Sequence, residues 1–227
     1  MPGIVSFSLF GKDPQGIYKH GALLNAQAYG EYYPDAICRF YVGASTLEWA
    51  SEHLAPMHHV QIEEMGGPEG FTATFWRYRA LQDRTFKYHL FRDCDSRPIL
   101  RERLAVNDWL ENSNKLYHVM RDHPYHNMPI LAGLWGVKYD GNTQNFYNLF
   151  RTQNMRSFYQ CDQVYLKAVV WEVIKTKTLG HVDCEHYFGE AENRPFPSSG
   201  FDEGFVGEGF YGDGRARFPH HSRDRVG

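Results

Sequence analysis

Strand-like and helix-like segments alternate through the first two-thirds of the chain, and this order constrains the fold more than any other feature. Residues 4–10 alternate apolar and small polar side chains and end at Gly11, which is typical of a strand. Four more strand-like segments follow at residues 37–42, 59–65, 88–91 and 116–120. Such alternation predicts an α/β domain with a mainly parallel central sheet flanked by helices.

The segments between these strands have helical features. Residues 17–29 place Gly21, Leu24 and Ala28 on one stripe, and residues 46–54 suit a short helix capped by Ser45 or Thr46. Apolar side chains recur at helical spacing over residues 71–81, and Pro98 allows another helix to begin just beyond it. Each predicted strand is therefore separated from the next by one crossover segment.

The second part of the chain is less regular. Residues 130–137 are apolar, and residues 144–154 and 162–175 are expected to be helical. From Glu192 onward the composition shifts to Gly, Pro, Arg and His. We expect one domain over residues 1–200 and an irregular tail over residues 201–227, either draped over the domain or disordered.

Charge and composition exclude several classes of protein. The 227 residues carry 24 Lys and Arg against 27 Asp and Glu, a net charge of −3, so a nucleic-acid partner is not expected. The first residues have no basic region before an apolar stretch, and no apolar run approaches the ~20 residues of a membrane span. Four widely scattered cysteines favour a reduced, cytoplasmic protein.

Two carboxylates follow the predicted strand at residues 88–91. Asp93 and Asp95 are separated by one residue, and ligands of open α/β sheets gather beyond the carboxyl ends of strands. Carboxylate oxygens are hard donors that suit Mg²⁺ or Mn²⁺, and these ions commonly complete their shell with diphosphate oxygens. An isolated pair of this kind is also found in ordinary acidic turns, so the surrounding residues decide its meaning.

Those surroundings resemble the DxD region of small GT-A-type glycosyltransferases found in bacteria and large algal viruses. The similar stretches, which together lie within residues 4–200, are residues 6–11, 37–41, 75–78, 91–97, 101–102, 105–110, 118–124 and 130–136. The resemblance implies a metal-dependent transfer of a sugar from a nucleoside-diphosphate donor, a UDP-sugar in the first instance, to a glycan or another hydroxyl acceptor. It also implies that Asp93 and Asp95 bind Mn²⁺ or Mg²⁺, with His181 as a third ligand.

The same resemblance suggests which residues bind the donor: Phe7, Ser8, Gly11, Arg77, Asp93, Ala132, Gly133 and Gln163. Phe7 has a second interpretation as a core residue, because it alternates with other apolar positions. Arg77 also has a second interpretation, as one member of an ion pair on the face of a helix. Small residues at 132 and 133 would let backbone amides approach the transferred sugar.

The sequence does not identify a single residue as the catalytic base. The candidate carboxylates are Asp122, Asp162, Asp183 and Glu190. A retaining transferase needs no such base, and Asp162-Gln163 together with a late histidine resembles retaining families. A phosphohydrolase with a DxD motif and a non-catalytic nucleotide-sugar-binding module are the alternative functions, and the oligomeric state is open.

Overall fold

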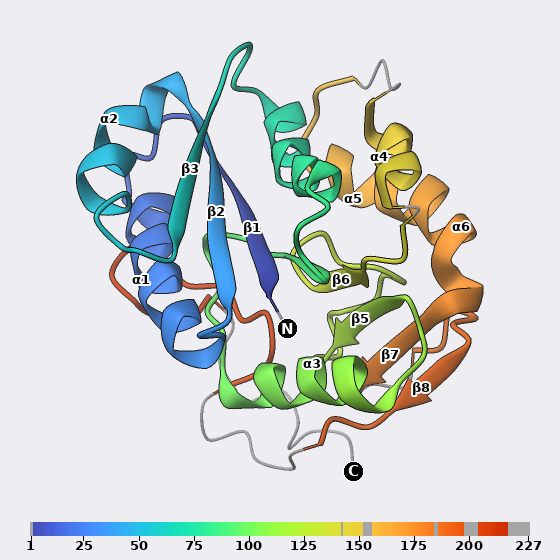
Figure 1. The fold of residues 1–227 in the computed structure, drawn as a ribbon. Helices are drawn as coiled ribbons and strands as arrows, with labels where there is room; N and C mark the ends of the chain where they lie inside the picture. Colours follow the sequence, from blue (N-terminus) through green and yellow to red (C-terminus); the bar gives the residue numbers. More distant parts are fainter. Residues whose placement is uncertain (1, 142, 152–155, 184–185, 198–203, 218–227) are drawn as a thin grey trace.

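The computed structural model describes residues 2–141, 143–151, 156–183, 186–197 and 204–217, which form an α/β domain (Figure 1). Within these residues eight strands make one sheet in the order β3-β2-β1-β4-β6-β5-β7-β8. The strands are β1 (Gly3–Leu9), β2 (Ala36–Gly43), β3 (Val60–Met65), β4 (Tyr88–Phe91), β5 (Tyr117–Arg121), β6 (Trp135–Lys138), β7 (Thr178–Val182) and β8 (Glu192–Arg194). The predicted α/β class with a mainly parallel sheet is confirmed.

Helices connect the strands. They are α1 (Ile17–Tyr32), α2 (Ala44–His53), the 3₁₀ helix η1 (Phe71–Gln82), α3 (Leu100–Asn112), α4 (Thr143–Arg151), α5 (Cys161–Tyr165), the π-helical turn η2 (Leu166–Val170), α6 (Trp171–Ile174) and the 3₁₀ turn η3 (Lys175–Lys177). The segment at 71–81 is thus a 3₁₀ rather than an α-helix, and the helix predicted at 162–175 contains a π turn. Residues 152–154 of the helix predicted at 144–154 lie outside the described residues.

The direction of the strands fixes where a ligand can bind. Strand β1 is parallel to β2 and β4, and β5 is parallel to β7. Strand β6 is antiparallel to both β4 and β5, so these two strands point the same way. The carboxyl ends of β1, β4, β5 and β7 therefore share one edge of the sheet, where ligands of such folds gather.

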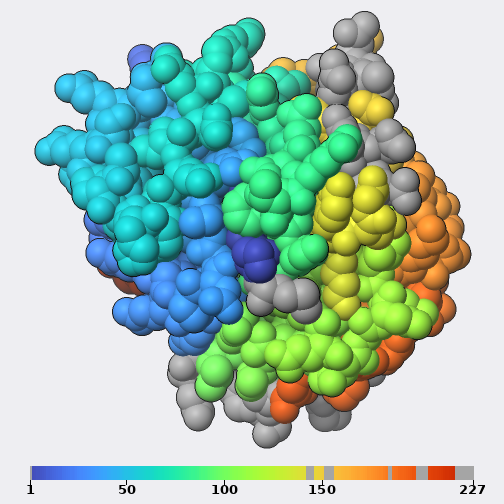
Figure 2. Space-filling view, in the orientation of Figure 1, coloured from blue at the N-terminus to red at the C-terminus, as the bar shows by residue number. Residues whose placement is uncertain are grey.

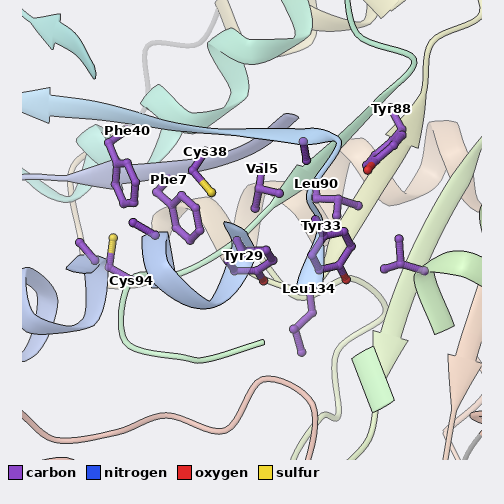
Figure 3. Close-up of a cluster of buried hydrophobic side chains, with 14 of the residues drawn as sticks. Val5, Phe7, Tyr29, Tyr33, Cys38, Phe40, Tyr88, Leu90, Cys94 and Leu134 are labelled. Atoms are coloured by element: carbon purple, nitrogen blue, oxygen red, sulfur yellow. The ribbon is translucent and has the colours of Figure 1, made fainter. Parts of the chain in front are cut away.

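Two hydrophobic clusters cover the two faces of the sheet, as the alternation of side chains along a strand requires. Phe7 belongs to the first cluster, where it stacks on Phe40 with ring centroids 4.7 Å apart and packs against Tyr29 of α1 (Figure 3). The Cys94 side chain lies in the same cluster. The hydrophobic core therefore includes Cys94, the residue between the two aspartates.

A buried ion pair anchors the end of β4. Arg92 Nε donates to Glu102 Oε1 of α3 at 2.9 Å, and the two side chains are almost completely buried. The Tyr29 hydroxyl also donates to Glu102 at 3.0 Å, which links α1 to the same pair. Because Arg92 immediately precedes Asp93, this network fixes the backbone from which the acidic motif begins.

The outside of the molecule follows the strand order. Figure 2 shows the N-terminal segments in blue and cyan on one side, the C-terminal segments in yellow and orange on the other, and the green middle of the chain between them. None of the helices in the described part of the chain is both long and apolar enough to cross a membrane.

Candidate active site

A pocket of about 800 Å³ opens at the carboxyl edge of the sheet. Residues at and after the ends of β1 and β4 line it, among them Ser8 and Asp93, together with the loop before β6, the start of α5 and part of the segment 207–217. Its volume lies within the range of sites that bind small molecules and cofactors. The pocket is therefore where the structure brings candidate functional residues together.

The acidic pair faces this pocket because the residue between its members faces the core. Cys94 is buried, and its Sγ lies 3.5 Å from the Ser8 carbonyl oxygen. The flanking side chains of Asp93 and Asp95 both line the pocket, and the Asp93 side chain is 44% exposed. Burial and the neighbouring Asp93 carboxylate raise the pKa of Asp95, so the two negative charges lie close enough to repel each other.

Arg77 of η1 connects this pair to α5. It donates to Asp93 Oδ1 at 2.5 Å and to Asp162 Oδ2 at 3.1 Å. The same guanidinium donates to the carbonyl oxygens of Thr74 and Arg92 at 2.9 Å each. Its side chain is almost wholly buried, so Arg77 holds the motif, η1 and α5 in fixed positions, although it also lines the pocket.

The loop before β6 is held by Gln163 of α5. Its Oε1 accepts from the Ala132 backbone N–H at 3.0 Å, and its Nε2 donates to the Ile130 carbonyl oxygen at 2.5 Å. Gly133 in this loop packs directly on the acidic motif, since a Cβ at position 133 would lie 2.2 Å from Asp93 Oδ2. Ala132, Gly133 and Gln163 all line the pocket.

The end of β1 supplies another wall. The Ser8 hydroxyl donates to the Thr74 carbonyl oxygen at 3.1 Å and accepts from the Arg77 backbone N–H at 3.0 Å. Gly11 lines the pocket with a φ of +83° and donates its backbone N–H to Glu69 Oε2 at 2.8 Å. Phe7 is absent from the pocket, because its ring belongs to the core described above.

His181 lies in β7 and does not line the pocket. One of its ring nitrogens is 2.7 Å from His118 Nε2, and the other is 3.2 Å from Asp108 Oδ2. Burial lowers the pKa of His181 to about 4, so the ring is neutral at pH 7. One nitrogen is thus engaged by a residue of β5 and the other by a residue of α3, and the geometry does not bring His181 to Asp93 and Asp95 as the predicted third metal ligand.

Three of the four candidate carboxylates also lie away from the pocket. Asp122 is fully buried and accepts from Arg101 Nε at 2.9 Å, and Asp183 accepts from Arg101 Nη2 at 2.7 Å. Glu190 forms a buried ion pair with Arg121. These groups hold β5, β7 and α3 together, so among the predicted bases only Asp162 reaches the pocket.

The structure adds pocket residues that sequence reasoning did not identify. His126 follows β5 and lines the pocket, and its Nδ1 accepts from the Asp122 backbone N–H at 3.0 Å. Burial lowers the pKa of His126 to about 3, so the neutral ring carries its proton on Nε2 and acts as a hydrogen-bond donor. Tyr18, Tyr159 and Arg217 are further lining residues, and none belongs to a motif that spacing reveals.

The acidic pair suits a divalent cation that needs few protein ligands. Within the described residues, no group of three or more His, Cys, Asp or Glu side chains could hold a metal ion. Mg²⁺ and similar hard ions are nevertheless held in many enzymes by one or two carboxylates, substrate phosphates and water. Burial and the charge of Asp93 raise the pKa of Asp95, so a nearby positive charge stabilises the ionised form of Asp95.

The comparisons with known proteins agree on the fold. No protein-family model and no curated protein matches the sequence. A mannosyltransferase from Pyrobaculum calidifontis, solved in complex with GDP-Man and Mn²⁺, matches with a TM-score of 0.52 and 14% identity over 87% of this chain and 58% of its own. The 4-diphosphocytidyl-2C-methyl-D-erythritol synthase of Anaerococcus prevotii matches with a TM-score of 0.50 and 8% identity over 78% of this chain and 86% of its own.

This protein shares the fold of these two enzymes. At these identities the likeness concerns the fold alone. The reaction depends on the residues that line the pocket.

Proposed function

We propose that this protein is a metal-dependent glycosyltransferase that moves a sugar from a nucleoside-diphosphate donor to a hydroxyl acceptor. The observation that carries this proposal is the placement of Asp93 and Asp95 together in an 800 Å³ pocket beyond the carboxyl end of the central strand β4. The expected donor is a UDP-sugar, in keeping with the GT-A resemblance of the sequence. The mannosyltransferase that shares the fold was solved with a nucleotide-sugar and Mn²⁺.

The two carboxylates would hold Mn²⁺ or Mg²⁺, and water and the diphosphate would complete its shell. When bound, the ion supplies positive charge that offsets the charge developing on the departing diphosphate. Ser8 and Gly11 line the pocket on the β1 side of the acidic pair, where we place the nucleoside. Ala132 and Gly133 line it beside Asp93, where we place the sugar.

Asp162 has a binding role in this proposal. Its Oδ2 accepts from Arg77 and its Oδ1 accepts from the Gln163 backbone N–H at 2.9 Å. With one oxygen held by a guanidinium and the other by a backbone N–H, the carboxylate is fixed in a single orientation, which suits hydrogen bonding to sugar hydroxyls. In keeping with the resemblance to retaining families, we favour retention of configuration, with Asp162 orienting sugar hydroxyls, and NMR of the product's anomeric proton would test it.

The division into a catalytic domain over residues 1–200 and a tail over residues 201–227 stays a proposal. Gly207, Gly209 and Arg217 line the pocket, so the described part of that tail belongs to the site. The acceptor is expected to be a glycan or a small hydroxyl compound. No nucleic-acid partner is proposed.

Hydrolysis of UDP-sugars in the absence of acceptor tests this function most simply. We expect slow release of UDP and free sugar with Mn²⁺, and loss of that release in EDTA and in Asp95→Asn. Asp183→Asn is the matched control, because Asp183 is an acidic residue outside the pocket, and it should retain activity within about twofold.

Other outcomes identify the alternatives. Phosphate release from simple phosphomonoesters, lost in Asp93→Asn, would indicate a phosphohydrolase. Metal-dependent UDP-sugar binding without any hydrolysis or transfer would indicate a binding module. Equal binding of UDP with Mn²⁺ and with EDTA would contradict the metal-dependent proposal.

A further inference from the structure

The described residues 204–217, which we call the C-terminal strap, cross the carboxyl edge of the sheet from β5 to the acidic motif. At one end the Val206 backbone N–H donates to Asp122 Oδ2 at 2.9 Å. Gly207 then packs against Leu134, since a Cβ at this glycine would lie 2.5 Å from that side chain. Further along, the Phe210 backbone N–H donates to the Asp95 carbonyl oxygen at 2.8 Å. These contacts dock the strap along the edge of the pocket, which Gly207, Gly209 and Arg217 line.

The strap then turns back on itself. The Tyr211 backbone N–H donates to the Arg215 carbonyl oxygen at 2.9 Å, and the Arg217 backbone N–H donates to the Gly209 carbonyl oxygen at 2.7 Å. Gly212 at the turn touches the loop before α1, because a Cβ there would lie 2.0 Å from the Gln15 carbonyl oxygen. This hairpin returns Arg217 to the acidic motif.

Arg217 forms an ion pair with one member of that motif. Its Nη1 lies 2.7 Å from Asp95 Oδ2, with the two side chains 26% and 18% exposed. The Arg217 charge counteracts the rise that burial and Asp93 cause in the pKa of Asp95. Arg215, two residues earlier, pairs with Asp213 instead and is 80% exposed. Of these two arginines, only Arg217 reaches the pocket.

A divalent ion and Arg217 would compete for Asp95. The ion needs a carboxylate oxygen at about 2 Å, and Asp95 Oδ2 already accepts from the guanidinium. Two cations bound to one carboxylate repel each other strongly in a partly buried site. Occupation of Asp95 by the ion therefore weakens the contact that holds Arg217.

We propose that Arg217 and the divalent ion are alternative cations for Asp95, so that the strap is held on the pocket in the metal-free protein and is loosened at Arg217 when the ion binds. The inference rests on the proposed function only in taking Asp93 and Asp95 as the metal site. It assigns the tail a role in controlling access to that site.

Titration with Mn²⁺, followed by the loss of its free-ion electron paramagnetic resonance signal, tests the competition directly. Without nucleotide, Arg217→Gln should bind Mn²⁺ about fivefold more tightly than the unaltered protein, because the competing charge is gone. Arg215→Gln removes the same charge from the same strap and should change the affinity by less than about twofold. Asp95→Asn should abolish the binding.

A second variant displaces the strap without changing its charge. In Gly212→Ala the new Cβ would collide with the Gln15 carbonyl oxygen, so the hairpin must shift. We expect Mn²⁺ to bind more tightly to this variant as well. Hydrogen exchange over residues 209–217 should rise when Mn²⁺ is added to the unaltered protein, and should already be raised in Arg217→Gln.

The outcomes separate this inference from the proposed function. If Mn²⁺ binds the unaltered protein through Asp95, and Arg217→Gln binds it equally or more weakly, the competition is overturned while the metal site stands. If neither protein binds Mn²⁺ without nucleotide but both bind it equally with UDP, the competition is overturned while the metal site stands, and if neither binds Mn²⁺ even with UDP, both are overturned. Thermal melting of each variant confirms that the compared proteins are folded.

Discussion

At the scale of single residues, Cys94 and Gly133 determine where the side chains of Asp93 and Asp95 lie. Cys94 is buried in the first hydrophobic cluster, so Asp93 and Asp95 on either side of it are turned to the pocket. Gly133 provides the space into which the Asp93 carboxylate fits. Neither function is visible in the spacing of the two aspartates, because each depends on a contact with a distant segment.

Gly133→Ala tests this contact. The added Cβ would meet Asp93 Oδ2 at 2.2 Å, so the carboxylate has to move. We expect Mn²⁺-dependent UDP binding to weaken about tenfold, as calorimetry would measure, with the protein still folded.

Gly66→Ala is the control for this substitution, since a Cβ at position 66 has nothing within 4 Å. It should bind UDP as the unaltered protein does. Equal binding in Gly133→Ala would show that the position of Asp93 is unimportant.

The sequence predicts the residues of the acidic motif well and the partners of isolated residues poorly. Asp93, Arg77, Gln163 and Gly133 lie together as expected, since they follow from where strands and helices end. His181 was predicted to approach the metal, but the pairing of β7 with β5 places His118 beside it. Strand order determines such neighbours, and a single sequence does not reveal it.

At the scale of elements, helix α1 is fitted tightly to the acidic motif. The Asp13 carboxylate accepts from the backbone N–H groups of Ile17, Tyr18 and Lys19 at 2.8–2.9 Å, which stabilises the start of the helix. One turn later, a Cβ at Gly21 would lie 2.0 Å from the Cys94 carbonyl oxygen. The helix can approach the motif this closely only because position 21 has no side chain.

Gly21→Ala therefore separates packing from helix propensity. Propensity alone predicts a gain of about 1 kcal/mol in the free energy of unfolding. The collision with a backbone oxygen predicts a loss of about 1–3 kcal/mol instead. Urea unfolding distinguishes the two, and any increase in stability would show that α1 does not pack on the motif as described.

The elements themselves were largely predictable, because local patterns determine them. The five predicted strands in the first 120 residues match β1 to β5 closely. The antiparallel insertion of β6 between β4 and β5 was not predicted. A strand of four residues, such as β6, does not encode which strands flank it, since that choice depends on contacts across the whole sheet.

At the scale of the whole molecule, the tail and the buried histidines matter most. The Gly-rich tail has no periodicity, so the sequence predicts only that it is irregular and does not distinguish a tail draped over the domain from a disordered one. The structure docks residues 204–217 through contacts such as Asp95–Arg217, which span more than half of the chain. Residues 201–203 and 218–227 of the predicted tail lie outside the described part of the chain.

The buried histidines predict how stability depends on pH. Burial lowers the pKa of His89 and of His181 to about 4, and also lowers the pKa of His118. In the unfolded chain these groups titrate near 6.5, so between about pH 6.5 and 4 the unfolded state binds more protons. The free energy of unfolding should therefore fall as the pH falls through this range, by up to about 3 kcal/mol for His89 alone.

Urea unfolding at several pH values between 7 and 4 measures this slope. His89→Gln removes one of the titrating groups at a position that does not line the pocket, so its curve should be less steep. A free energy of unfolding that stays constant over the range would mean that these histidines have the same pKa in the folded protein as in the unfolded chain.

The most direct test of the metal-dependent account is a crystal of the protein grown with Mn²⁺ and UDP, examined by anomalous scattering. We predict one strong manganese peak between the Asp93 and Asp95 carboxylates, with the diphosphate bound to the same ion. A clear diphosphate in the pocket with no manganese beside it, or manganese bound elsewhere, would contradict the proposed role of the acidic pair.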